Sequence, residues 1–279
     1  MSEETGGLWV SVKETVKTVV YALLIAGVFR TLFFQPFWIP SGSMKETLLI
    51  GDFLFVNKMA YGYSYASCPS IRIPQLGVDL GADDFCGAFE DAEGRLFGSE
   101  PERGDIVVFR HPVTGRDFIK RLIGLPGDRV QVRDGDLYLN DAKVSVEDAG
   151  VFTEIYGPQG RFGYEPSCAN GVVGEGAVCE KQRRIETLPN GVSYATLNVG
   201  ARALDNTGVF TVPADEFFFM GDNRDNSTDS RVAQAARGVG FVPRADIVGR
   251  ADRVIFSSAG RSMLAVWTWR LDRLFKSLN

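Results

Sequence analysis

The sequence predicts a mainly β protein with one long apolar segment near its N-terminus. The apolar runs in the 279 residues are short and rich in valine, isoleucine and phenylalanine, and turn-forming residues separate them. Glycine occurs 31 times and proline 12 times, which suits many strands and turns. Between Lys58 and Asp246 no helical period of useful length is visible. Hydrophobic residues make up 45 % of the chain, enough for a sizeable core.

The apolar segment of residues 18–39, TVVYALLIAGVFRTLFFQPFWI, contains Arg30 as its only charged residue. About 20 apolar residues span a bilayer, so the segment predicts a transmembrane anchor whose helix ends near Phe34, before Pro36. A cleavable signal peptide is one alternative, but bulky residues follow the apolar core where a small-residue cleavage site is expected. A buried core helix is the other, and the apolar residues on every face favour the span.

The charges around this segment indicate its orientation. Lys13 and Lys17 precede the span, which favours an N-terminus inside the cell and the following residues outside. We therefore predict an N-terminus and anchor over residues 1–36 and a β-rich domain over residues 37–258.

The C-terminal segment, residues 259–279, has apolar residues at helical spacing with basic residues between them. The apolar positions are Trp267, Leu271, Leu274 and Leu278, and the basic positions are Arg270, Arg273 and Lys276. The segment is too charged to cross a membrane. We expect an amphipathic helix that lies on the membrane surface or docks on the domain, and the sequence leaves both open.

Within the β-rich domain, eight runs predict strands. They are residues 53–57, 105–110, 118–123, 129–133, 136–139, 208–211, 216–220 and 247–256. Asp134-Gly135 lies between two alternating runs, a signal for a type I′ hairpin turn. Residues 61–100 and 150–207 are expected to be loop-like insertions.

The four cysteines all follow the apolar segment, and none forms a C-x-x-C pair, which argues against a zinc ribbon or a thioredoxin-type site. Two local disulfides, Cys68–Cys86 and Cys168–Cys179, are the simplest arrangement in an oxidising compartment, and each would close one insertion. The other two pairings, and four reduced buried cysteines, stay open.

Composition excludes several other classes. The net charge is −5 and basic residues are spread along the chain, which argues against nucleic acid as a partner. His111 is the only histidine, so most zinc geometries are excluded and any Ser–His–Asp mechanism depends on it alone. Its position in Arg110-His111-Pro112 predicts a solvated turn residue.

The first candidate for chemistry is the small-residue turn Pro40-Ser41-Gly42-Ser43, directly after the apolar segment. Such a turn can expose a hydroxyl and bring backbone N–H groups near a substrate carbonyl. Taken alone, an S-G-S sequence is usually an ordinary loop.

The second candidate is Lys120, which lies in the apolar strand of residues 118–123 beside Arg121. Strand parity does not say which cation is buried. A general base must lose its proton, and burial lowers the pKa of lysine, whereas arginine stays protonated. If one of the two is a base, it is Lys120. The alternative is an edge-strand lysine whose stem covers apolar surface.

The third candidate is the polar segment MGDNRDNSTDSR, residues 220–231, after an apolar strand. A calcium loop built from Asp222, Asp225 and Asp229 is one interpretation, but the EF-hand spacing is absent. A rigid turn with an Asp229–Arg231 ion pair and a hydrogen-bonding Ser227 fits as well.

Together these segments resemble the bacterial type I signal peptidases, which are Ser–Lys dyad serine proteases. The resemblance rests on five boxes in order: P-S-G-S-M-x-x-T-L, G-D, R-G-D-I-V-V-F, I-K-R-x-I-G-x-P-G-D and G-D-N-R-D-N-S-x-D-S-R. It covers residues 15–58, 101–140 and 208–256, and neither insertion. It implies a signal-peptidase-like β-sheet or barrel domain that cleaves signal peptides after small residues, in A-x-A-type sites. It also implies a single-pass protein of the bacterial inner membrane with a periplasmic catalytic domain, lipid contact, and neither cofactor nor metal.

The resemblance also assigns roles to residues. Ser43 is expected to be the nucleophile and Lys120 the general base, with Ser41 and the Ser43 backbone N–H forming the oxyanion hole. Ser227 is expected to orient Lys120, while Asp229 and Arg231 hold that loop. The pockets for small side chains are expected to be lined by Phe37, Ile39, Met44, Leu48, Phe118 and Ile119.

One position departs from the family pattern, which usually has proline where this chain has Glu46. The change affects the turn after Ser43 or the charge near the pocket, and it removes no catalytic group. Two rival functions also fit parts of the sequence. A self-cleaving repressor domain has a related Ser–Lys arrangement but carries a DNA-binding helix-turn-helix. A non-catalytic, membrane-tethered envelope module predicts that Ser43 and Lys120 lie far apart.

Overall fold

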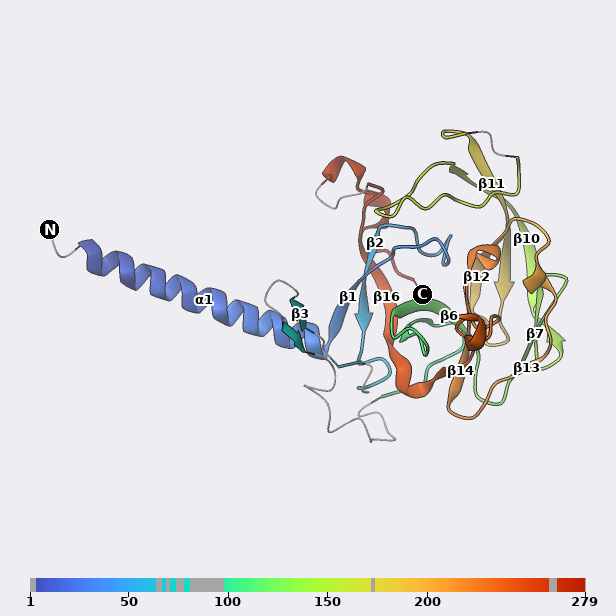
Figure 1. The fold of residues 1–279 in the computed structure, drawn as a ribbon, viewed down its shortest axis with the longest axis horizontal. Coiled ribbons are helices and arrows are strands. Elements are labelled where there is room, and N and C mark those ends of the chain that lie inside the picture. Colours follow the sequence, from blue (N-terminus) through green and yellow to red (C-terminus); the bar gives the residue numbers. More distant parts are fainter. Residues whose placement is uncertain are drawn as a thin grey trace.

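A long helix precedes a β domain in the computed structural model of the chain, which describes residues 4–63, 67–68, 71–73, 78–80, 98–171, 174–260 and 265–278. Helix α1, Glu4–Leu32, extends away from the β domain, and the N-terminus lies at its far end (Figure 1). It begins well before the apolar segment and so includes Lys13, Glu14 and Lys17. In the part of the chain described, no helix combines the length and apolarity of a membrane span. The predicted anchor therefore stays a prediction.

The largest sheet has seven strands in the order β1-β2-β16-β5-β6-β14-β15. Their bounds are β1 Phe34–Trp38, β2 Asp52–Asn57, β5 Ile106–Arg110, β6 Asp117–Gly124, β14 Glu216–Met220, β15 Val242–Pro243 and β16 Ile247–Ser257. All of its strand pairs are antiparallel. The chain enters this sheet through β1, whose register pairs Phe37 with Leu54 of β2.

Three smaller sheets complete the strands of the described residues. One contains β7 Arg129–Arg133, β8 Asp136–Leu139, β9 Ala142–Lys143 and β13 Phe210–Thr211. Another contains β10 Ser145–Ile155, β11 Val178–Thr187 and β12 Ser193–Asn198, and the last pairs β3 Ile71–Ile73 with β4 Val78–Leu80. Single 3-10 turns occupy Ala203–Asp205, Arg224–Asn226, Gln234–Ala236, Arg244–Asp246, Val266–Thr268 and Leu271–Arg273.

All eight predicted strands are confirmed, as is the predicted hairpin. The turn residues Asp134 and Gly135 have φ angles of 49° and 78°, and a type I′ turn needs positive φ at both positions. Gly135 takes up this conformation without the steric cost of a side chain.

The prediction that residues 150–207 are loop-like is wrong. They contain the end of β10 and all of β11 and β12. The strand β11 reads VCEKQRRIET, and its side chains alternate between buried and exposed only over the first half. Charged residues therefore obscure the period of two on which strand prediction depends. The expected domain boundary at residue 36 stays a prediction; in this structure residue 36 lies in β1, which pairs with β2 over its whole length.

The predicted C-terminal helix is not confirmed. The described residues 265–278 form two single 3-10 turns. Ser277 bridges to Arg253 of β16, and Trp269 bridges to Ser258, directly after β16. Arg273 is buried, and its guanidinium contacts both carboxylate oxygens of Asp52 at 3.0 and 2.6 Å. A buried carboxylate draws this basic residue inward, whereas an amphipathic surface helix would direct it to solvent.

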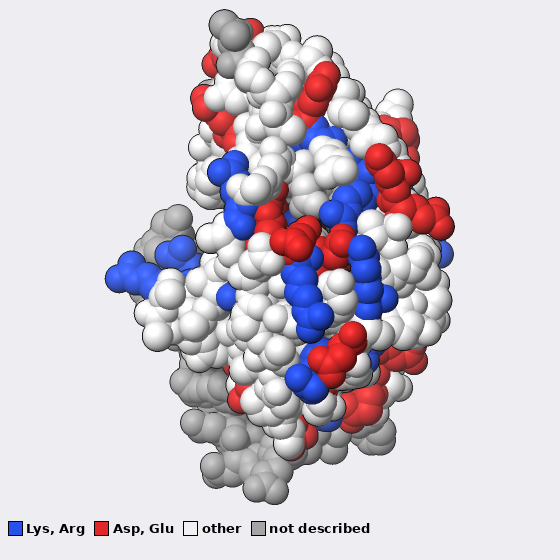
Figure 2. All heavy atoms as spheres, turned by 90° about the vertical axis from the view of Figure 1, so that its right-hand side faces the viewer, with Lys and Arg blue, Asp and Glu red and all other residues white. Residues whose placement is uncertain are grey.

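The core beside residues 40–43, here called the nucleophile turn after the role predicted for Ser43, joins β1, β2, β5, β6 and β16. It contains the buried residues Ile39, Met44, Leu48, Leu54, Val56, Ile106, Val108, Ile119, Val248, Ala251 and Val254. Because the segment after β1 contributes apolar side chains to this core, its short polar turn is held against the sheet. Figure 2 shows a face of the molecule on which basic and acidic side chains are interleaved, so neither sign forms a continuous patch there.

Candidate active site

The turn that follows β1 places two serines beside a cavity of about 270 Å³. Ser43 is 7 % exposed, whereas Ser41 is exposed to solvent. The cavity is lined by Ser41, Gly42, Ser43, Lys45, Ile50, Phe118, Lys120, Gln159, Tyr164, Glu165, Pro166, Asn226 and Thr228. Side chains from four distant parts of the sequence therefore meet around one hydroxyl.

Lys120 approaches Ser43 directly from β6. Its Nζ lies 2.7 Å from the Ser43 Oγ and 3.0 Å from its neighbour's carbonyl oxygen, that of Ile119. Lys120 is 4 % exposed. The central feature of the site is thus a buried amine within hydrogen-bond distance of a serine hydroxyl, which is the geometry a nucleophile and its base require.

The environment favours the neutral amine of Lys120. Burial lowers the pKa of Lys120 to about 8, although the negative charges of Asp229 and Asp222 act in the opposite direction. A lysine with this pKa is neutral in about half of the molecules at pH 8. The amine can therefore accept a proton near neutral pH.

The loop after β14 holds the nucleophile turn in place through hydrogen bonds. The Asn223 backbone N–H donates to the Ser43 carbonyl oxygen at 3.0 Å, and its side-chain amide donates to the Gly42 carbonyl oxygen at 2.8 Å. The neighbouring Asp222 accepts two hydrogen bonds from Arg121, at 2.8 and 2.7 Å, and one from Thr47 at 2.5 Å. These bonds tie the loop to both the turn and β6.

Asp229 and Arg231 form the ion pair that the sequence predicts, at 2.9 Å between buried side chains. Burial raises the pKa of Asp229, but the Arg231 guanidinium and the Gly221 N–H outweigh this effect and lower the pKa below its usual value. The Ser227 hydroxyl is buried next to this carboxylate and has no partner at ordinary hydrogen-bond geometry. Its predicted contact with Lys120 is therefore absent from this structure.

Gly221 allows these elements to approach closely. A Cβ at this position would lie 2.2 Å from the Ser227 Oγ and 2.6 Å from the Ser43 carbonyl oxygen. Contacts below 3.0 Å are not tolerated between real atoms of this kind. Glycine is therefore required at position 221, where the loop contacts the backbone of Ser43.

The six residues predicted to line substrate pockets occupy two environments. Ile39, Met44, Leu48 and Ile119 are buried in the core around the nucleophile turn, and Phe37 packs against that core. Of the six, Phe118 lines the cavity at Ser43.

The prediction that His111 is solvated is wrong, because its side chain is 1 % exposed. Its Nδ1 accepts hydrogen bonds from the Val113 and Thr114 N–H groups, at 3.1 and 3.3 Å, and its ring packs on the edge of Phe118. Burial lowers the pKa of His111. Because Nδ1 accepts these bonds, the proton of the neutral ring lies on Nε2, and neither nitrogen is free to act as a base.

The three aspartates of the possible calcium loop, Asp222, Asp225 and Asp229, have separate partners. Asp222 pairs with Arg121, Asp229 pairs with Arg231, and Asp225 accepts the Val199 N–H at 2.7 Å. Across the described residues, no three His, Cys, Asp or Glu side chains form a group that could hold a metal ion. The segment is a hydrogen-bonded structural loop.

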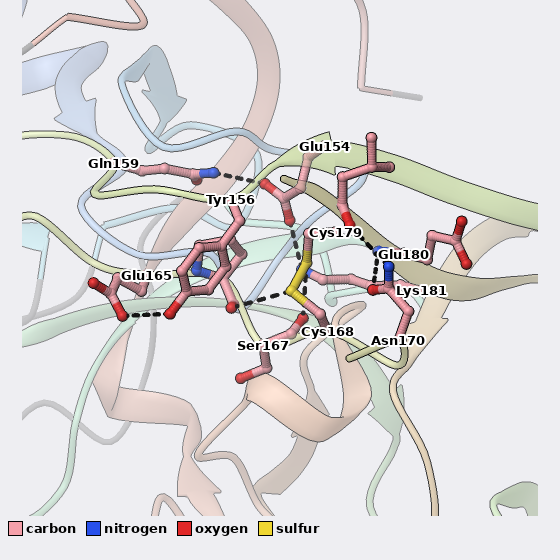
Figure 3. Close-up of a disulfide and its surroundings, with 12 residues drawn as sticks. Glu154, Tyr156, Gln159, Glu165, Ser167, Cys168, Asn170, Cys179, Glu180 and Lys181 are labelled. Carbon is pink, nitrogen blue, oxygen red and sulfur yellow. Dashed lines mark hydrogen bonds and ion pairs between the residues drawn. A yellow bond between two sulfur atoms is a disulfide. The ribbon is translucent and has the colours of Figure 1, made fainter. Parts of the chain in front are cut away.

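The second insertion reaches the cavity, which sequence reasoning missed. Gln159, Tyr164, Glu165 and Pro166 line it together with Phe118. The predicted disulfide Cys168–Cys179 is present and closes this segment onto β11 (Figure 3). Cys68 is also disulfide-bonded, and its predicted partner Cys86 lies outside the described residues.

Sequence reasoning also missed the roles of Asp222, Asn223 and Arg121. The density of polar residues in 220–231 was visible, and Arg121 is adjacent to the predicted base. Their pairing was not visible, because Arg121 and its partner Asp222 are 101 positions apart in the sequence.

Comparison with known proteins gives consistent matches. A family model described as signal peptidase, peptidase S26, matches residues 12–256. A protein named Signal peptidase I from Rickettsia typhi is 36 % identical, with 96 % of this chain and 94 % of that protein covered. Another of the same name from Rickettsia canadensis is 38 % identical, with 94 % and 92 % covered.

One solved structure is also similar in sequence. It is a crystal structure of a signal peptidase I from Enterococcus faecalis, 28 % identical, covering 55 % of this chain and 97 % of that chain. The TM-score is 0.27, so the description of the fold rests on the contacts within this chain and not on that structure.

Proposed function

The chain belongs to the signal peptidase family, peptidase S26, and we propose that it removes N-terminal signal peptides from exported preproteins with Ser43 as nucleophile and Lys120 as base. Members of this family are serine endopeptidases, and so is this chain. The observation that carries the proposed mechanism is the 2.7 Å contact between the Lys120 Nζ and the Ser43 Oγ.

In this mechanism neutral Lys120 takes the Ser43 hydroxyl proton while the oxygen attacks the scissile carbonyl. The resulting ammonium then gives its proton to the departing amine, and a water molecule hydrolyses the acyl-enzyme with Lys120 again as base. A buried lysine suits these steps because burial brings its pKa to about 8. We propose that Asp229 and Arg231 hold the loop beside the dyad; the Ser227 hydroxyl makes no hydrogen bond with Lys120 in this structure, so no orienting role is proposed for it.

Ser41 is proposed to stabilise the oxyanion together with the Ser43 backbone N–H. Ser41 lines the same cavity as Ser43, so its hydroxyl can donate to an oxygen that develops charge there. Removing one such donor typically lowers the rate by about 10²–10³. We expect Ser41→Ala to lose kcat by this factor and Ser43→Ala to lose all cleavage. Full activity in Ser41→Ala would refute the oxyanion assignment.

The proposed cleavage occurs after small residues, in A-x-A-type sites. Phe118 lines the cavity at Ser43, and Ile39, Met44, Leu48 and Ile119 form the core directly behind the Ser43 turn, so they are proposed to back the pockets for small side chains. Phe37 and Phe118 are proposed to complete the pockets. The test is a purified preprotein with an A-x-A site and a matched preprotein in which the last alanine is phenylalanine. Cleavage of both at equal rates would exclude the proposed specificity.

We also propose that residues 1–36 anchor the chain in the bacterial inner membrane with the β domain on the periplasmic side. The apolar run of residues 18–29 and the lysines that precede it support this, as does the disulfide Cys168–Cys179. Flotation of the expressed chain with vesicles, followed by protease protection, tests it. A chain that stays in the aqueous fraction after carbonate extraction would contradict the anchor.

The rival envelope module predicted that Ser43 and Lys120 lie far apart, which they do not. The rival repressor-type protease needs a helix-turn-helix, whereas the described residues before the β domain form one helix, α1. Cleavage of signal peptides is therefore the better account.

A further inference from the structure

Lys45, two residues after the nucleophile, has no part in the mechanism above. It is 4 % exposed and lines the same cavity as Ser43. A buried ammonium is costly unless other groups satisfy its charge and its donors. Its partners therefore indicate why a lysine occupies this position.

The partners of Lys45 come from the second insertion. Its Nζ contacts the Glu154 Oε2 at 2.5 Å and the Gln159 Oε1 at 2.7 Å. The Gln159 amide donates to the same Glu154 oxygen at 2.7 Å, so the three side chains form a closed ring of hydrogen bonds. The other Glu154 oxygen accepts from Lys181 of β11 at 2.7 Å (Figure 3).

The segment of residues 156–168, here called the strap, runs from the end of β10 to Cys168. Its far end is joined to β11 by the disulfide Cys168–Cys179, with 5.1 Å between the Cα atoms. A small turn within it is closed by backbone bonds between Gln159 and Tyr164, at 2.9 and 3.1 Å. The strap supplies part of the cavity wall, through Gln159, Tyr164, Glu165 and Pro166.

Lys45 also contacts the nucleophile turn with its apolar stem. A Cβ at Gly42 would lie 3.4 Å from the Lys45 Cε, so the stem packs directly against the Gly42 backbone. One side chain therefore joins the turn that carries Ser43, through its stem, to the strap, through its ammonium.

We propose that Lys45 is a positioning residue that holds the strap against the nucleophile turn and so sets the geometry of the peptide-binding cavity. The inference rests on the proposed proteolytic function and adds a residue to its substrate-binding wall. Lys45 acts through Glu154 and Gln159. Its loss lets the strap move away from Ser43, and the substrate peptide then loses contacts with that wall.

The choice of variants separates an effect on substrate binding from a loss of overall stability. Lys45→Met keeps an unbranched stem against Gly42 and removes the ammonium alone. Glu154→Gln keeps the shape of the partner and removes its charge. Lys143→Met, which breaks an exposed ion pair with Asp136, is the matched control. Steady-state cleavage of an A-x-A preprotein is measured for these three single variants, for Lys45→Arg and for the Lys45→Met, Glu154→Gln double variant, well below their unfolding temperatures.

We expect KM to rise on the order of tenfold in Lys45→Met and in Glu154→Gln, with kcat within about twofold of the parent, because uniform substrate binding is lost. The double variant is expected to be no worse than the poorer single variant, since both act through one contact. Lys45→Arg, which keeps the charge, should restore most of the KM.

Three results would overturn the inference. They are an unchanged KM in Lys45→Met, additive losses in the double variant, and a Lys45→Arg enzyme as impaired as Lys45→Met. If a variant unfolds, the Lys45→Arg rescue decides alone. A folded parent that cleaves no preprotein would instead remove the proposed function, so the two failures are distinguishable.

Discussion

Lys120→Met is expected to abolish cleavage while leaving the fold and substrate binding intact. Methionine has nearly the length of lysine and fills the buried site without a charge, and the nearby carboxylates of Asp222 and Asp229 keep Arg121 and Arg231 as partners. Without a base the Ser43 hydroxyl stays protonated. Loss of a nucleophile–base unit lowers kcat by roughly 10⁴–10⁶. The loss is measured as the rate of cleavage of purified preprotein in samples quenched at fixed times, with Lys143→Met as the control.

Lys120→Arg should be equally inactive, because arginine stays protonated and cannot accept the Ser43 proton. In the parent, log kcat/KM should rise by about one per pH unit below pH 8 and level off above it, since the neutral amine is the active form and its pKa is about 8. Measurable turnover by Lys120→Arg, or a profile that is flat from pH 6 to 9, would show that another group is the base.

Gly221→Ala is expected to cause the largest loss among substitutions that remove no catalytic group. The new Cβ would lie 2.2 Å from the Ser227 Oγ and 2.6 Å from the Ser43 carbonyl oxygen. Ser227 can move, but the Ser43 carbonyl also accepts the Asn223 N–H, so the nucleophile turn is displaced with the loop. A shift of about 1 Å at a reacting group can cost about 10²-fold in rate. Overpacking adds a stability loss of roughly 1–3 kcal/mol.

Gly208→Ala is the matched control, because a Cβ there meets no atom within 4 Å. Denaturant unfolding and kcat/KM are measured on both variants. A Gly221→Ala enzyme that keeps more than half of the parent kcat/KM would mean that the loop and the turn separate without affecting catalysis.

Five of the seven strands of the largest sheet, β2, β5, β6, β14 and β16, were predictable because their apolar residues follow a clear pattern, whereas β1 and β15 were not predicted. The same method failed for β11, where charged residues serve as partners for other buried groups: Lys181 is fully buried against Glu154. It failed again at the C-terminus, where helical spacing was present but the Asp52–Arg273 ion pair directs the chain inward. Long-range ion pairs of this kind leave no periodic signal in the sequence.

The candidate site was only partly predictable from the residues alone. Ser43 and Lys120 became a pair through the resemblance to signal peptidases, because 77 positions separate them and no local pattern joins them. Lys45 and Glu154, separated by 109 positions, were not identified, since a lysine after a turn and a glutamate in a polar segment are unremarkable in sequence. Only the folded chain brings such residues to one cavity.

The most direct test of the central assignment is to map the bond cleaved in a purified A-x-A preprotein by the detergent-solubilised parent and by Ser43→Ala. Mass spectrometry of the products should give one cut after the second alanine with the parent and an intact preprotein with Ser43→Ala. A folded parent that cuts nowhere, or a Ser43→Ala variant that still cuts at that bond, would contradict Ser43 as the nucleophile of a signal-peptide-cleaving enzyme.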